Sequence, residues 1–145
     1  MPIDENTIPL CREAAEQWVE THHEEGIEDE LTAINLLFDH WDALGLVGGC
    51  IKLFGRVEAF TIGEMLNEHM ALIHIEKANP TIRGLYQAIN NEFIRHEFVD
   101  TQFINREEDM GLPGLRMAKE SYNPDHFAEK YDARCIKQGA CEDNV

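Results

Sequence analysis

The stretch of sequence that decides the fold is Met70–Leu115, which reads MALIHIEKANPTIRGLYQAINNEFIRHEFVDTQFINREEDMGLPGL. Met70–Lys77 is rich in β-favouring residues, Thr81–His96 carries apolar residues at helical spacing, and Val99–Asn105 is β-rich again. A strand, a helix and a strand in this order predict a crossover connection. Such a connection normally places its two strands in parallel.

The helix of this crossover has a predicted start and one apolar face. Asn79 is expected to cap the free N–H groups of the first turn, and Pro80 suits the first helical position because it lacks an N–H. Apolar residues recur at helical spacing, namely Ile82, Leu85, Tyr86, Ile89 and Phe93. We therefore expect Ile89 and Phe93 to pack against the sheet.

The rest of the chain is expected to extend or cover this sheet. Residues 1–45 carry two apolar stripes at helical spacing, so they predict two helices, the second ending at Gly45 as a C-terminal cap. Val47–Phe54 and Val57–Leu66 predict two strands joined by a tight turn. A short helix and a last strand, Phe127–Cys135, are expected after the crossover.

These elements give the order α-α-β-β-β-α-β-α-β, which indicates an α+β chain with one mixed sheet. At 145 residues and 43% hydrophobic content, the chain is long enough for one domain with a core. We expect residues 1–45 to form a helical lead-in, residues 46–135 the sheet core, and residues 136–145 a frayed tail.

The charge of the chain is strongly negative and uneven. The formal net charge is −16, and residues 1–45 hold 12 acidic residues against one basic residue, Arg12. Such acidity disfavours non-specific binding to nucleic acid and to anionic membrane surfaces, so no DNA partner is expected. No apolar run is long enough for a membrane span, and no secretory signal precedes the polar start.

Cysteine and histidine usage gives no sign of a metal site or a disulfide framework. The four scattered cysteines lack Cys-x-x-Cys spacing, which indicates reduced thiols in a cytoplasmic protein. His22 and His23 diverge by about 100° on a helix, so they are poorly placed to share one ion. We expect no bound metal.

Three strings in the core carry a family resemblance. They are GLVGGCIKLFGRVEAFTIGEML, IHIEKANPTIRGLYQAINNEF and INREEDMGLPGLRMAKESYNP. Together with the element order, they resemble a GNAT acyltransferase core and a bacterial family named after the C-terminal domain of phosphatidylglycerol lysyltransferase. The resemblance implies transfer of an acyl or aminoacyl group from a small-molecule donor or to a small-molecule acceptor. Members usually contain two such halves in tandem, which implies a second GNAT-like half, or a homodimer, as partner.

The sequence departs from these relatives where a donor would bind. The lysyltransferases move lysine from charged tRNA to a membrane lipid, whereas this chain is acidic and lacks membrane segments. Acetyl-CoA-dependent GNAT enzymes carry a Gln/Arg-x-x-Gly-x-Gly/Ala loop before the crossover helix, where this chain has KANPTIRG. Lys77, Asn79 and Thr81 of that string are the candidate cofactor-binding residues. The donor stays open between a coenzyme A thioester and an aminoacyl-tRNA.

Strand Met70–Lys77 carries two candidate functional residues, His74 and Glu76. Regular alternation predicts that Leu72, His74 and Glu76 share one face, opposite Ala71, Ile73 and Ile75. A carboxylate and an imidazole on one face can share a proton, so Glu76 is a candidate general base and His74 a candidate substrate ligand. The alternative is that both are hydrogen-bonded residues beneath the N-terminal helices.

Polar residues after the fourth predicted strand supply the remaining candidates. Asn105 and Arg106 are candidate substrate ligands for a carbonyl and for a carboxylate or phosphate, or else they anchor the loop by a salt bridge. Lys119 is a further candidate substrate ligand on the last predicted helix. The resemblance implies Tyr122 as a general acid for the leaving group, with core packing as the alternative.

The resemblance also implies where a ligand lies. In a GNAT sheet, strands Met70–Lys77 and Val99–Asn105 part at their C-terminal ends and leave a gap for an acyl donor. Two function classes remain open at this point. One is an acyltransferase-like domain that transfers an acyl or aminoacyl group to an amine or hydroxyl acceptor, and the other is a non-catalytic half that binds a small ligand or packs against a partner domain.

Overall fold

A four-stranded mixed sheet forms the centre of the fold in the computed structural model, which describes residues 1–107 and 113–134. The chain divides into two units, Met1–Glu108 and Asp109–Val145. The elements of the first unit are α1 (Ile8–Thr21), α2 (Ile27–Asp39), α3 (Trp41–Leu44), β1 (Val47–Leu53), β2 (Arg56–Met65), β3 (Met70–Ala78), α4 (Leu85–Glu97) and β4 (Phe103–Asn105).

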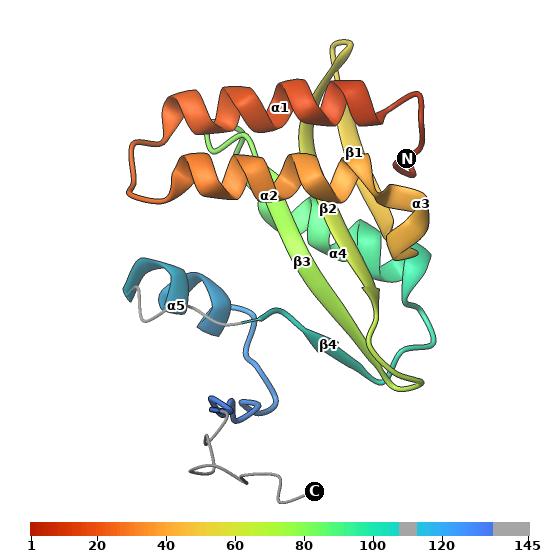
Figure 1. Cartoon of the computed structure of the whole chain (residues 1–145), viewed down its shortest axis with the longest axis vertical. Coiled ribbons are helices and arrows are strands. Elements are labelled where there is room, and N and C mark those ends of the chain that lie inside the picture. Colours follow the sequence, from red (N-terminus) through yellow and green to blue (C-terminus); the bar gives the residue numbers. More distant parts are fainter. Residues whose placement is uncertain (108–112, 135–145) are drawn as a thin grey trace, which may run out of the picture. The chain divides into compact units, whose positions relative to one another are not determined.

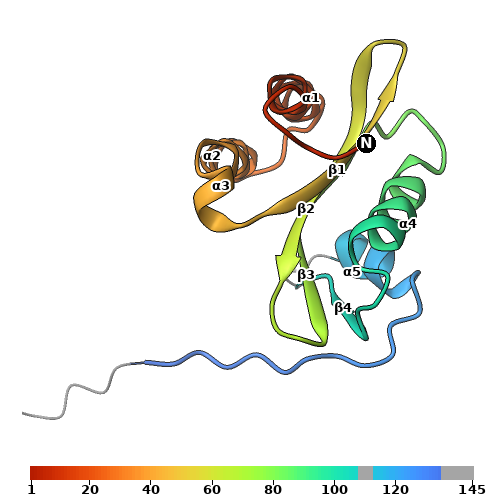
Figure 2. The same cartoon turned by 90° about the vertical axis from the view of Figure 1, so that its right-hand side faces the viewer.

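The sheet has the strand order β1-β2-β3-β4 and is covered on both faces (Figures 1 and 2). Strands β1, β2 and β3 form an antiparallel meander, and β3 pairs with β4 in parallel. This confirms the crossover and the mixed sheet that the sequence predicts. Helices α1 and α2 lie on one face and α4 on the other (Figure 2).

Each face of the sheet has its own apolar core. Against α1 and α2, the buried cluster includes Ile34 and Phe38 of α2 and Phe60 and Ile62 of β2. On the opposite face, Phe93 of α4 packs with residues of β3 and contacts Phe98 edge-on, with ring centroids 5.1 Å apart. Ile89 and Phe93 are 2% and 3% exposed, so the expected burial of the α4 stripe is confirmed.

A β-bulge interrupts the pairing of β2 with β3. Ile62 pairs with Ile75, but the next residue of β2, Gly63, pairs with Ile73, so His74 is the extra residue on β3. A Cβ atom on Gly63 would lie 2.6 Å from the carbonyl oxygen of Leu72 and 3.4 Å from the ring of Phe93. Only glycine therefore fits at this position, where α4 approaches the sheet.

Three predicted helix and strand boundaries in the first unit are wrong. Helix α4 begins at Leu85 after Gly84, which has a φ of 79°, and the Asn79–Arg83 segment forms turns instead of the first helical residues. The second N-terminal helix breaks at His40, so Gly45, with a φ of 63°, ends the separate helix α3. Strand β4 begins at Phe103 and not at Val99, because residues 99–102 form no strand and the pairing with β3 starts only at Phe103; its end at Asn105 is as predicted.

The second unit contains α5 (Pro113–Glu120), which confirms the short helix expected there. The predicted last strand, Phe127–Cys135, is wrong for the residues that the structure describes, since residues 127–134 form no strand. This segment has no Val, Ile or Thr, and Phe127 and Tyr131 are exposed, so neither β-propensity nor burial favours pairing. Cys135 and the predicted tail 136–145 lie outside the described residues. None of the described helices combines the length and apolar content needed to cross a bilayer.

Replacing Phe93 with alanine tests the packing of α4 on the sheet. We expect Phe93→Ala to lower the free energy of unfolding by about 3–5 kcal/mol, the range for a large aromatic side chain lost from a core. The measurement is urea denaturation followed by circular dichroism. The matched control is Asn91→Ala on the exposed face of the same helix, for which we expect a change within about 0.5 kcal/mol. Equal small losses for both variants would contradict the packing.

Candidate functional site

The candidate site lies where β3 and β4 separate. The two strands pair at only three positions, Met70 with Phe103, Ala71 with Ile104 and Leu72 with Asn105. Beyond Leu72, β3 continues to Ala78, while the chain after Asn105 leaves the strand, and the two ribbons diverge in Figure 1. Among the described residues, this part of β3 is paired only with β2. The backbone N–H and C=O groups on its other edge, toward β4, therefore have no partner strand.

Glu76, Arg106 and Asn90 join β3, the chain after β4 and α4. The Arg106 guanidinium donates to both carboxylate oxygens of Glu76, with Nη2–Oε1 at 2.8 Å and Nη1–Oε2 at 3.3 Å. Asn90 of α4 donates to Oε2 of Glu76 at 3.1 Å. The Glu76 side chain is 9% exposed, so this is a largely buried ion pair with an amide partner. It holds together the two strands beyond the point where their backbones stop pairing.

His74 lies between two carboxylates. Its Nε2 is 3.2 Å from Oε1 of Glu64 on β2, and its Nδ1 is 3.0 Å from Oε1 of Glu107, just after β4. A carboxylate can only accept, so both hydrogen bonds form together only on the protonated imidazolium. Because Glu64 is two residues from Ile62 on the same strand, it shares the face that α1 and α2 cover.

The expected arrangement of His74 and Glu76 on one face is wrong. Lys77 lies over the ring of Trp18 in α1, 3.7 Å from the ring centroid, and makes an ion pair with Glu30 of α2. Glu76 lies on the opposite face, where it contacts Asn90 of α4. The bulge at His74 is the cause, because an extra residue reverses the alternation on one side of it. Accordingly, Ile73 packs against Phe93 of α4, whereas Ile75 packs against the core under α1 and α2.

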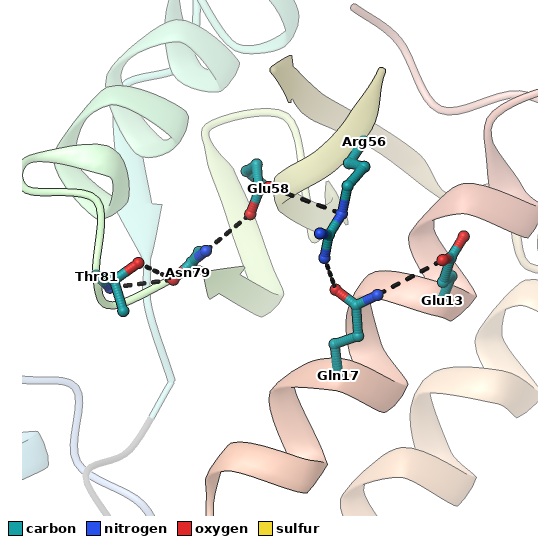
Figure 3. A network of polar contacts seen from close by, with 6 residues as sticks. All are labelled: Glu13, Gln17, Arg56, Glu58, Asn79 and Thr81. Carbon is teal, nitrogen blue, oxygen red and sulfur yellow. Dashed lines mark hydrogen bonds and ion pairs between the residues drawn. The ribbon is translucent and has the colours of Figure 1, made fainter. Parts of the chain in front are cut away.

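Asn79 and Thr81 shape the turn before α4 (Figure 3). Oδ1 of Asn79 accepts from the backbone N–H and the hydroxyl of Thr81, at 3.0 and 2.7 Å. Nδ2 of Asn79 donates to Oε2 of Glu58 at 2.9 Å. Glu58 also pairs with Arg56, which donates to Gln17 of α1. These polar contacts fix the chain between β3 and α4, so Asn79 caps a turn rather than the helix.

The other predicted site residues divide between the two units. Asn105 is the last residue of β4, and its Oδ1 accepts the backbone N–H of Glu107 at 2.8 Å. Lys119 lies in the last turn of α5, and Tyr122 follows the end of that helix. Both residues belong to the second unit. The structure thus brings His74, Glu76, Asn105 and Arg106 to the strand ends, while Lys77 faces α1 and α2.

Sequence reasoning missed Asn90 and Glu64. Asn90 is buried at 6% exposure, four residues from Tyr86 and three from Phe93, so a polar residue interrupts the apolar stripe of α4. That interruption was the available signal for a buried polar contact. Glu64 had no such signal, because its contact with His74 depends on the register of β2 with β3.

The turn before α4 does not form a pyrophosphate cradle. Its Lys77 is engaged with Glu30 on the other face of the sheet, and Pro80 supplies no N–H. Gly84 is the only glycine of the turn. At the strand ends, Arg106 is paired with Glu76, and His74 lies between two glutamates.

The sheet, its covering helices and its diverging strands define the GNAT acetyltransferase fold. A ribosomal-protein-alanine N-acetyltransferase from Brucella melitensis biovar Abortus 2308 matches with a TM-score of 0.63 at 12% identity, covering 92% of this chain and 97% of that chain. A predicted acetyltransferase from Clostridium acetobutylicum, solved with acetyl-CoA, matches with a TM-score of 0.59 at 13% identity, covering 92% and 94%. At such identities these likenesses show the fold alone.

The family is narrower than the fold. The family model "Phosphatidylglycerol lysyltransferase, C-terminal" matches residues 2–134. A conserved protein of unknown function from Bacteroides thetaiotaomicron VPI-5482 is 36% identical over 87% of this chain, with a TM-score of 0.82. The chain therefore belongs to the phosphatidylglycerol lysyltransferase C-terminal family. It spans 44% of the length of the Bacteroides protein. A comparison with curated proteins found no significant match.

A double-mutant cycle tests the ion pair at the strand ends. We expect Glu76→Gln and Arg106→Gln to be coupled by about 1.5–3 kcal/mol in the free energy of unfolding, the range for hydrogen bonds to charged groups. The control cycle uses Arg12 and Asp39, a more exposed ion pair between α1 and α2, for which we expect about 0.2–1 kcal/mol. A coupling energy for Glu76 and Arg106 no larger than that of the control would show that the pair does not hold the strands.

Proposed function

We propose that this chain is an acyltransferase-like domain that binds an acyl or aminoacyl donor between the ends of β3 and β4. It then transfers the acyl group to an amine or hydroxyl acceptor. The observation that carries the proposal is the early end of the β3–β4 ladder, at Leu72 and Asn105, while β3 continues to Ala78. An extended donor lying beside β3 makes hydrogen bonds with the backbone groups on the edge of β3 that β4 does not pair. A backbone N–H there polarises the donor carbonyl.

Arg106 and Glu76 have linked roles in this proposal. Both terminal nitrogens of Arg106 contact Glu76, so an anionic group of the donor binds Arg106 by replacing that carboxylate. Glu76 is then released from the ion pair and accepts a proton from the attacking amine or hydroxyl. His74 and Asn105 line the acceptor side. Donor binding and base activation are thereby coupled.

The charge at the strand ends favours a particular class of donor. Three carboxylates, those of Glu64, Glu76 and Glu107, lie around Arg106 and His74. A donor with several phosphates is repelled by these carboxylates, whereas one with a single anionic group needs only Arg106. We therefore propose a small acyl or aminoacyl donor in preference to intact coenzyme A.

The second candidate function is a non-catalytic half that binds a ligand or packs on another domain. One observation favours it: in this structure Glu76 and both ring nitrogens of His74 are engaged with charged partners. This chain spans 44% of the Bacteroides relative, and we propose that a second GNAT-like half is the partner. Alternatively, a second copy of this chain takes the place of that half in a homodimer. Binding without turnover, in the experiment below, distinguishes this candidate from the first.

Ligand binding is tested first by thermal unfolding of the full chain with acetyl-CoA, coenzyme A, free amino acids and amino-acid esters. A ligand at a hundredfold excess over its dissociation constant raises the free energy of unfolding by about 2.7 kcal/mol. We expect the strongest response from an amino-acid derivative. A response to acetyl-CoA and coenzyme A alone would contradict the proposed donor class.

The position of the ligand is tested next, by measuring its affinity for the Arg106→Ala variant with calorimetry. We expect the variant to lose at least about tenfold in affinity, since each 1.4 kcal/mol of lost contact is a factor of ten. Arg12→Ala is the matched control, because it removes the same charge from an ion pair on the far helices α1 and α2. Equal affinity in Arg106→Ala and in the parent chain would move the site elsewhere. A native circular dichroism spectrum for both variants is required for the comparison.

A further inference from the structure

A second side-chain bridge crosses the gap between the ends of β3 and β4. His74 and Glu107 each lie two residues beyond Leu72 and Asn105, the last pair of the β3–β4 ladder. Nδ1 of His74 is 3.0 Å from Oε1 of Glu107. This contact therefore joins the two chains at a point where their backbones no longer pair, as the guanidinium–carboxylate pair does further along β3.

The bridge between His74 and Glu107 depends on a proton. The other ring nitrogen of His74, Nε2, is 3.2 Å from Oε1 of Glu64 on β2. An ionised carboxylate only accepts hydrogen bonds, and a neutral imidazole carries only one N–H. A neutral His74 can therefore donate to Glu64 or to Glu107 but not to both. The imidazolium donates to both, and its charge attracts both carboxylates.

We propose that the His74–Glu107 contact is a pH-dependent latch on the gap between β3 and β4. With His74 charged, Glu107 is held against β3 and the latch is closed. With His74 neutral, its one N–H stays with Glu64, Glu107 leaves, and the latch is open. Histidine is the side chain that ordinarily changes its charge between about pH 5 and 8. The latch therefore closes on acidification and opens as the pH rises.

The backbone at Glu107 makes this residue, and not Glu64, the partner that leaves. Glu107 has a φ of 56°, in the left-handed region where a residue with a Cβ atom is strained. Its N–H donates to Oδ1 of Asn105 at 2.8 Å, and its carboxylate contacts His74. Glu64 lies within β2, where it is paired with Leu72 of β3. Loss of the contact with the ring therefore lets Glu107 relax, whereas Glu64 stays in the ladder.

The charged groups around the latch leave the imidazole as the group that titrates near neutral pH. Glu64 of β2 and Glu107, after β4, contact the ring itself. Further along β3, the neighbouring elements contribute two ion pairs, Lys77 with Glu30 of α2 and Glu76 with Arg106. Ordinary glutamate, lysine and arginine side chains keep their charges between about pH 5.5 and 8.5. A change at Glu107 within this range is therefore expected to follow the proton on His74.

The consequence of the latch for binding rests on the proposed function, but the latch itself does not. If a donor lies between β3 and β4, it has two side-chain bridges to displace while His74 is charged. It has only the Arg106–Glu76 pair to displace when His74 is neutral. Donor binding is then expected to strengthen as the pH rises. The contact between His74 and Glu107 is a property of the chain alone, so it is measured without a ligand.

Nuclear magnetic resonance on the full chain, between about pH 5.5 and 8.5, tests the latch. We expect the ring nitrogens of His74 and the backbone amide of Glu107 to change their chemical shifts together, with one midpoint. The protection of the Glu107 N–H against exchange with water, corrected for the intrinsic effect of pH, is expected to fall as the proton leaves. The expected fall is roughly twofold to fivefold, the range for a partly exposed ion pair.

Three variants separate the latch from a general effect of pH. His74→Gln lacks the titrating group, so the transition at Glu107 is expected to disappear. In Glu107→Gln, the new amide can accept from the charged ring or donate to the neutral one, so position 107 is expected to stay bridged throughout. His96→Gln is the matched control, because His96 contacts Glu92 at 3.4 Å on the exposed face of α4. It is expected to leave the transition at Glu107 unchanged.

Three outcomes overturn the latch. The first is a Glu107 amide that stays constant while the His74 ring titrates, which means that the bridge does not follow the proton. The second is a transition at Glu107 that persists in His74→Gln, which means that another group drives it. The third is protection that rises with pH, which reverses the sign. The titration of the parent chain does not depend on the folding of any variant. A thermal screen in which no donor binds would contradict the proposed function and leave these measurements unchanged.

Discussion

The bulge at His74 is the constraint on which the rest of the sheet depends. It lets β3 present Ile75 and Lys77 to the layer of α1 and α2, while Ile73 and Glu76 face α4. Strict alternation would instead place Ile73 and Ile75 on one face, and Glu76 with His74 on the other. Gly63 opposite the bulge leaves room for Phe93, so the same irregularity also sets how closely α4 approaches the sheet.

The divergence of β3 and β4 is compatible with a stable fold because side chains replace the missing backbone pairing. Past Leu72 and Asn105, the ladder gives way to the Arg106–Glu76 pair and the contact from Asn90. A largely buried ion pair adds little stability by itself, since desolvation offsets the attraction, but it penalises arrangements that separate its partners. The Arg106–Glu76 pair therefore fixes the position of the chain after β4. It also keeps these two charged side chains next to the edge of β3 that β4 leaves unpaired.

Much of this organisation was readable from local pattern, and the part that was not depends on register. The crossover, the meander and the apolar stripe of Phe93 follow from residue periodicity, which reflects the period of each element. The start of α4 at Leu85 was missed because Asn79 and Pro80 give the same signal for a turn as for a helix cap. The sequence analysis wrongly placed His74 and Glu76 on one face, because a bulge is a shift in the register of two strands and cannot be recognised from the residue pattern of one strand. The last predicted strand failed because its segment lacks Val, Ile and Thr, and its aromatic residues Phe127 and Tyr131 stay exposed.

The central claim is that the ends of β3 and β4 receive the ligand. Amide hydrogen exchange on the whole chain, with and without the ligand that stabilises it most, tests this claim directly. The account predicts slower exchange in residues 73–78 and 103–107, where the ligand completes the interrupted ladder, and unchanged exchange in the hairpin of β1 and β2. Slower exchange confined to the α1–α2 connection, with residues 73–78 and 103–107 unaffected, would contradict it.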